Sequence, residues 1–144
     1  MQTFEVLLYS TSENKAKVEV LFECETFWLS QKKMTKLFNV DVATINYHLK
    51  IIFRSRELKK DATIRKFLIV QNEGGREVGR DVDFYNLDAI IAVGYRVNSK
   101  EATSFRIWAT NTLREFIIKG FVLDDERLKQ GTKFGNDYTN FIGQ

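Results

Sequence analysis

The stretch LSQKKMTKLFNVDVATINYHLKIIF, residues 29–53, constrains the fold most, because it contains two apolar periodicities separated by only three residues. Ser30 is a good N-cap, and the apolar residues that follow it recur at helical spacing. Asn39 can end this first helix in a left-handed conformation, and Asp41 can cap a second helix. The apolar side of the second helix is predicted to hold Ile45, Leu49, Ile52 and Phe53. The stretch therefore predicts two short helices that meet at the turn Asn39–Val40–Asp41.

This spacing matches the requirements of a DNA-binding helix-turn-helix. Thr35 falls where the first helix needs a small residue, and Asn39 falls where the turn needs a positive φ. Val40 takes the buried turn position, and Ile45 is the buried aliphatic residue of the second helix. The alternative reading is a packed helical pair whose lysine face is solvated. Helical hairpins with this spacing also occur in proteins that never bind DNA.

The outward-facing residues near the start of the second helix are the candidate DNA contacts. Asn46 can pair with adenine in the major groove, whereas Tyr47 and Lys50 can hold phosphates. Asp41 and Val42 are poor groove contacts, so the stretch is expected to grip DNA more than to select a sequence. The predicted DNA-binding residues are Lys32, Lys33, Lys36, Ala43, Asn46, Tyr47, Lys50, Arg54 and Arg76.

The charge distribution supports a polyanionic partner. The net charge of the chain is only +3, but residues 30–66 contain ten Lys and Arg against three acidic residues, a net charge of +7. The preceding residues carry −3 and the following residues carry −1. A block of this kind is the electrostatic footprint of a nucleic-acid-binding protein.

The remaining elements predict an α+β, winged-helix-like fold. Strands are expected over Phe4–Ser10 and Lys17–Trp28, forming an N-terminal β-hairpin. The sequences ATIRKFLIVQ and REVGRDVDFYN flank NEGG and predict a second β-hairpin, a candidate basic wing. Two C-terminal helices are expected, one capped by Asn86 and one running from a Ser99 cap to Gly120. Residues 1–122 are predicted to form one domain, and residues 123–144 a tail that begins a further helical region.

An enzyme is not expected. Cys24 and His48 are the single cysteine and the single histidine, and they lie in unrelated segments. Zinc ligands, a phosphate-binding loop and a nucleophile elbow are missing, so no cofactor and no metal site is predicted. The loose acidic group Asp81, Asp83 and Asp88 leaves a metal-dependent nuclease as a remote alternative. The sequence contains no apolar run long enough to span a membrane and no secretory signal, so a cytoplasmic protein is expected.

Three segments of the sequence resemble those of a known family. They are the opening stretch with its preceding Phe-Trp, VDFYNLDAIIAVGYRVNSKEATSFRIWATNTLREFIIKGF, and LDDERLK. In these phrases the sequence resembles the RhuM family of bacterial and phage-associated virulence proteins. The second half also distantly resembles the Bro-N domain of phage antirepressors. These relatives imply DNA binding and a mobile-element origin, but no settled biochemical activity. The chain departs from the family at Thr35, where Ala is usual, and by ending at Gln144 where members usually continue.

The sequence therefore predicts sequence-tolerant binding of double-stranded DNA by a regulator derived from a phage or mobile element. A second copy of the chain is a further expected partner, because helix-turn-helix modules often bind two half-sites as dimers. No membrane and no small-molecule substrate is expected. The alternative function is a protein-interaction module, an antirepressor or a host-directed effector, that acts through the aromatic C-terminal helix and the LDDER segment.

Overall fold

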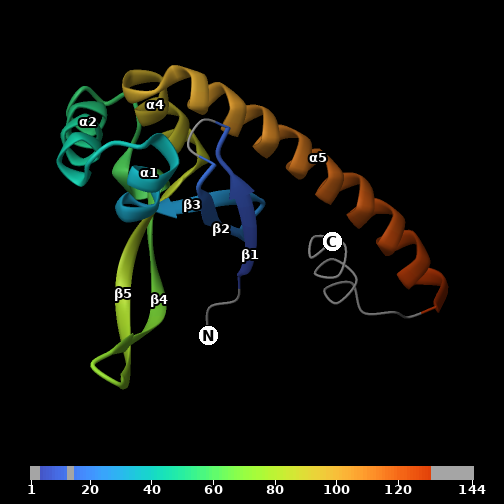
Figure 1. The fold of residues 1–144 in the computed structure, drawn as a ribbon. Helices are drawn as coiled ribbons and strands as arrows, with labels where there is room; N and C mark the ends of the chain where they lie inside the picture. Colours follow the sequence, from blue (N-terminus) through green and yellow to red (C-terminus); the bar gives the residue numbers. More distant parts are fainter. Residues whose placement is uncertain (1–3, 13–14, 131–144) are drawn as a thin grey trace. The chain divides into compact units, whose positions relative to one another are not determined.

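The computed structural model describes residues 4–12 and 15–130, with side chains as far as Phe116. The chain is α+β, with one five-stranded antiparallel sheet and five helices (Figure 1). The strands are β1 (Glu5–Ser10), β2 (Lys17–Glu23), β3 (Thr26–Ser30), β4 (Ile64–Glu73) and β5 (Arg76–Asn86). The helices are α1 (Gln31–Phe38), α2 (Val42–Arg54), α3 (Lys60–Thr63), α4 (Leu87–Val97) and α5 (Ser99–Gln130).

The sheet has the strand order β1-β2-β3-β5-β4. The predicted single strand Lys17–Trp28 is wrong, because it consists of β2 and β3 joined by a tight turn at Cys24–Glu25. Both turn residues have a left-handed backbone, with φ of 52° and 60°. Two consecutive positive φ values fit the two-residue turns that match the twist of a hairpin. Neither residue is Gly or Asn, so the sequence carried no signal for this turn.

The second predicted hairpin is confirmed. β4 and β5 pair from Ile64↔Tyr85 to Glu73↔Arg76, and Gly74 and Gly75 form the turn with φ of 60° and 80°. This conformation is easily reached only by glycine. β4 begins two residues later than predicted, since Ala62 and Thr63 belong to α3. The hairpin extends well beyond the helices (Figure 1).

The main core lies between one face of the sheet and the helices. Val18, Val20, Phe27 and Leu29 line the sheet side, and each is fully buried. The helices contribute Met34, Leu37, Phe38, Ile45, Leu49, Ile52, Ile90 and Val93. Strand alternation places a second cluster, Leu21, Trp28, Phe67 and Phe84, on the opposite face of the sheet.

A buried carboxylate fixes β1 to the start of α5. Glu101 is 1% exposed and accepts a hydrogen bond of 2.7 Å from the Tyr9 hydroxyl. It also accepts bonds from the backbone N–H and the hydroxyl of Ser12, both at 3.1 Å. Burial and the neighbouring carboxylate raise the pKa of Tyr9 well above its ordinary value, so the phenol remains a donor.

The packing of α1 against α4 depends on Gly94. A Cβ at this position would lie 2.6 Å from Phe38 Cζ and 2.7 Å from Ala102 Cβ. The side-chain amide of Asn98 donates to the Phe38 carbonyl at 3.2 Å, so it satisfies a terminal carbonyl of α1. These contacts join α1, α4 and the first turn of α5.

Both predicted ends of the last helix are wrong. Asn98, rather than Ser99, caps α5, since its side-chain oxygen accepts the Glu101 N–H at 3.2 Å. The helix continues past Gly120 to Gln130. Glycine lowers helix propensity by about 1 kcal/mol, which is not enough by itself to end a helix. The predicted Asn86 cap of α4 is confirmed by its bond from the Ala89 N–H.

The chain divides into two units, Met1–Phe105 and Arg106–Gln144. All five strands, α1 to α4 and the beginning of α5 belong to the first unit. Most of the predicted tail, residues 131–144, lies outside the described residues. Among the described helices, none is both long enough and apolar enough to cross a membrane.

Gly94→Ala should destabilise the protein by roughly 1–2 kcal/mol. Alanine improves helix propensity, but its methyl group would overpack the buried Phe38 ring and Ala102. Chemical denaturation monitored by circular dichroism measures the change. Gly79→Ala is the matched control, because its Cβ would meet only the side-chain end of exposed Leu68. A Gly94→Ala protein as stable as the wild type would contradict this packing.

Candidate nucleic-acid interface

The junction of α1 and α2 has the predicted local structure. The Ser30 hydroxyl accepts the Lys33 N–H at 3.2 Å, which confirms it as the cap of α1. Asn39 ends the helix with φ 57° and ψ 48°, the left-handed conformation expected there. Asp41 caps α2 by accepting the Thr44 N–H at 2.8 Å. Two helices therefore meet across three residues, with Val40 half-buried rather than fully buried.

The outer face of α2 consists of Ala43, Asn46, Tyr47, Lys50 and Arg54. These residues recur every three or four positions, so they share one side of the helix. Tyr47 is 60% exposed, Asn46 is half-buried, and the other three are exposed. Ile45, Leu49 and Ile52 point to the core, as predicted, whereas Phe53 is only half-buried. The structure therefore leaves this face open to a partner.

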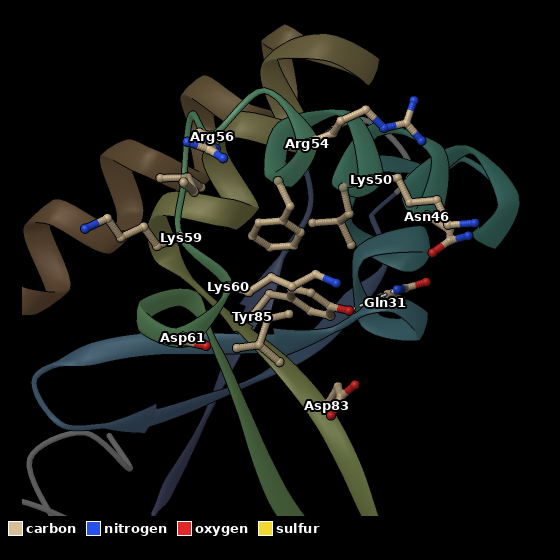
Figure 2. Close-up of a pocket in the computed structure, with 14 residues that line it drawn as sticks. Gln31, Asn46, Lys50, Arg54, Arg56, Lys59, Lys60, Asp61, Asp83 and Tyr85 are labelled. Atoms are coloured by element: carbon tan, nitrogen blue, oxygen red, sulfur yellow. Dashed lines mark hydrogen bonds between the residues drawn. The ribbon is translucent and has the colours of Figure 1, made fainter.

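A groove of about 870 Å³ lies beside the outer face of α2. We call it the basic groove (Figure 2). Its walls are α2, the base of the β4–β5 hairpin and residues 55–61. We call residues 55–61 the connector, and it includes the start of α3. Its cationic lining residues are Lys50, Arg54, Arg56, Lys59 and Lys60, and its acidic ones are Asp61 and Asp83. Asp83 is already paired with Lys66 at 2.8 Å, so the groove has an excess of positive charge.

Aromatic rings lie inside the basic groove. Phe53 stacks on Tyr85, with ring centroids 6.4 Å apart and planes inclined by 24°. The Gln31 side-chain amide donates to the Tyr85 hydroxyl at 3.0 Å (Figure 2). Lys60 Nζ lies 5.9 Å from the centre of the Phe53 ring, a cation–π arrangement. The groove thus combines cationic side chains with one half-buried aromatic ring, Phe53, because Tyr85 is only 6% exposed.

The predicted lysines of α1 lie along a different groove. Lys32, Lys33 and Lys36 line a hollow of about 1,090 Å³ that also involves β4 and β5. Gln31, Asp83 and Tyr85 line both grooves, so the two hollows are neighbours. Lys33 forms an ion pair with Glu19 at 3.3 Å, which uses part of its charge. The nine predicted residues are therefore distributed over several surfaces rather than one.

The β4–β5 hairpin is less basic than its arginines suggest. Arg80 donates two bonds of 2.6 Å to the Glu73 carboxylate, which lowers the pKa of Glu73 and raises that of Arg80. Arg65 pairs at 2.8 Å with Glu23, the last residue of β2. Arg76, which was predicted to contact DNA, lies next to the turn and makes no ion pair with any described residue. Exposed pairs of this kind add little stability, but they do balance the local charge.

Most groove residues were not predicted as site residues, among them Gln31, Phe53, Arg56, Lys59, Lys60 and Tyr85. The cations among them belong to the basic block of residues 30–66, so the sequence did carry their charge. Their position was hidden because the connector of residues 55–61 has no periodic pattern. Its path depends on contacts such as the Arg96–Glu57 ion pair of 2.5 Å.

Catalytic groupings are scarce in the part of the chain with described side chains. No three His, Cys, Asp or Glu residues there come together as metal ligands. Cys24 is exposed, and its Sγ lies 3.2 Å from the Arg65 guanidinium. His48 lies on α2 with a buried Nδ1 atom that has no hydrogen-bond partner among the described residues. These two residues share no site.

Fold and surface together define an α+β protein with a basic groove next to an exposed helix. Residues 62–142, more than half of the chain, match the virulence protein RhuM family. The chain belongs to this family, as its sequence motifs predicted. The matched region begins after α2 and covers the β4–β5 hairpin and α4. Searches of curated proteins and of solved structures gave no match.

The Asp41 cap should make part of the stability of the protein depend on pH. Hydrogen bonds from Thr44 hold the pKa of Asp41 below its ordinary value. A carboxylate whose pKa is lowered in the folded state stabilises the folded protein at pH values above its unfolded-state pKa. This stabilisation is lost as the pH falls through the folded-state pKa. Asn also caps helices but does not titrate. The stability of wild type relative to Asp41→Asn should therefore fall between about pH 5 and pH 3.

Urea denaturation of both proteins across this pH range measures the difference. Glu77→Gln, on the exposed part of β5, controls for a lost carboxylate without a capping role. A wild-type advantage that stays constant with pH would contradict the role of Asp41.

Proposed function

We propose that the protein binds double-stranded DNA, with α1 and α2 acting as a helix-turn-helix and α2 as its recognition helix. The observation that carries this proposal is the exposed outer face of α2 beside the basic groove. Recognition helices place exposed polar side chains against base edges while flanking cations hold the phosphates. The three-residue turn, the left-handed Asn39 and the buried Ile45 all support this role.

Each residue of the outer face has a proposed task. Asn46 pairs with an adenine edge, since its amide offers one donor and one acceptor. Tyr47, Lys50 and Arg54 contact phosphates on either side of the base. Val42 is 54% exposed and Asp41 is negatively charged at the start of α2. These two residues limit base readout, so the protein holds DNA with little sequence preference.

The β4–β5 hairpin acts as a wing in this proposal. Strands of ten and eleven residues extend it by roughly 30 Å. That length is close to one turn of B-DNA, about 34 Å. Arg76 at the tip then reaches a flanking phosphate, whereas the paired Arg80 and Lys66 contribute less. A regulator encoded on a phage or mobile element uses binding of this kind, alone or as a dimer.

Binding to duplex DNA should depend strongly on salt. If about six phosphates are neutralised, log K should fall with log salt with a slope of roughly −5. Lys50→Glu should weaken binding to every sequence by about tenfold or more, because it removes a phosphate contact and adds repulsion. Fluorescence anisotropy at several salt concentrations measures both effects.

Lys17→Glu is the matched control for this charge reversal. Lys17 is exposed on β2, lines neither groove and makes no ion pair with a described residue. The Lys17→Glu protein should bind duplex DNA with almost the affinity of the wild type. No binding at low salt, or equal losses for the two variants, would contradict the proposed interface.

Asn46→Ala should act differently from Lys50→Glu. The loss of one bidentate base contact removes about 1–3 kcal/mol of discrimination at a single base pair. Affinity for random sequence should change little, because the phosphate contacts remain. Selection of preferred sites from a randomised duplex pool, by wild type and variant, checks this. An unchanged preference in the variant would show that Asn46 reads no base.

A protein-interaction module is the second candidate, and one observation favours it. The two edge strands carry exposed apolar side chains, Val6 and Leu8 on β1 and Leu68 and Val70 on β4. A partner strand can add to such an edge. The side chains of the LDDER segment lie outside the described residues. Binding of a protein partner that Lys50→Glu leaves intact would support this function instead.

A further inference from the structure

We infer that the basic groove holds an unpaired strand of nucleic acid that continues from the duplex on the outer face of α2. The preferred ligand is then a duplex with a single-stranded extension, rather than a blunt duplex. This inference rests on the proposed function, since it assigns a second part of the same ligand to a second surface. It is carried by the charge, the aromatic lining and the position of the groove.

The cations of the groove are available to a ligand. Lys50, Arg54, Arg56, Lys59 and Lys60 make no ion pair with any described residue. By contrast, Arg65, Lys66, Arg80 and Arg96 are each paired with a carboxylate. Clustering of unpaired cations around one hollow is costly without a counter-charge, and it attracts an anionic ligand.

The cations are also spread along the groove. In Figure 2, Arg56 and Lys59 lie on the left of the groove, and Lys50 and Asn46 lie on the right. Lys60 extends across the hollow between them. A single phosphate would be held by donors that converge on one point. A series of cations along a channel instead fits the successive phosphates of a strand.

The lining between the cations suits an exposed base. Phe53 is half-buried, Leu49 is buried beside it, and both line the groove with Tyr85. Bases of any sequence stack on aromatic rings, and this contact is open only to a base that is unpaired. Lys60 now lies over the Phe53 ring. Its flexible side chain can leave that position and pair with a phosphate when a base enters.

The groove begins where the duplex would end. Asn46 and Lys50 belong to the outer face of α2 and also line the groove. A strand that separates from its complement at this point enters the groove directly. Blunt duplex DNA has no unpaired base to place on Phe53, so it leaves the aromatic lining of the groove unused.

The test compares three labelled ligands by fluorescence anisotropy: a blunt duplex, the same duplex with an unpaired extension of about ten nucleotides, and that single strand alone. The extension should tighten binding to the wild type by about tenfold. Arg56→Glu with Lys59→Glu should abolish this gain. Phe53→Leu, which keeps an apolar side chain, should reduce it without changing the affinity for blunt duplex.

The double variant has a matched control in Lys15→Glu with Lys17→Glu. Lys15 and Lys17 are both exposed. Lys15 has a positive φ of 53°, close to the 62° of Arg56. The net charge changes equally, so the control variant should keep the full gain from the extension. Thermal unfolding of each variant confirms that it is folded.

The outcomes separate this inference from the proposed function. Duplex binding that gains nothing from an extension, or a gain that survives in the Arg56 and Lys59 variant, overturns the groove assignment alone. Absence of duplex binding, together with single-strand binding that needs Arg56 and Lys59, overturns the proposed function and supports the groove as a strand-binding site.

Discussion

Phe38 approaches Gly94 so closely that no other residue fits at position 94. This contact positions α1 and α2, which form the candidate nucleic-acid interface. Phe38 is the last residue of α1, and the chain turns at Asn39 directly after it. The ring is held by Gly94 and Ala102, while Asn98 bonds to the Phe38 carbonyl. The end of α1 is therefore fixed on α4 and on the first turn of α5. Since only three residues separate α1 from α2, the direction of α2 follows from the same contact.

The distribution of charge separates structural from functional cations. Three cations of the β4–β5 hairpin, Arg65, Lys66 and Arg80, are paired with carboxylates, so they present little net charge. The cations of α2 and of the connector make no ion pair with any described residue, and they line a groove. Family membership alone does not explain this, because the matched residues 62–142 exclude α2. The proposed function therefore rests on the chemistry of this chain's own surface.

Local features of the fold were predictable from sequence, and features set by tertiary contacts were not. The Ser30 and Asp41 caps, the left-handed Asn39 and the Gly74–Gly75 turn depend on a few neighbouring residues. The Cys24–Glu25 turn lacks turn-forming residues, and it forms because β2 and β3 pair on both sides of it. α5 passes through Gly120, which the sequence suggested as its end. The basic groove is lined by residues 56–61 together with Tyr85, and no sequence pattern predicts that these segments come together.

The central claim is that the outer face of α2 contacts DNA. Amide chemical shifts of the ¹⁵N-labelled protein, followed during titration with a short duplex, test it residue by residue. We expect the largest changes in residues 42–54, smaller changes in residues 31–36, and almost none in β1 and β2. Changes confined to the edge strands β1 and β4, or no change in α2 at saturating DNA, would contradict it.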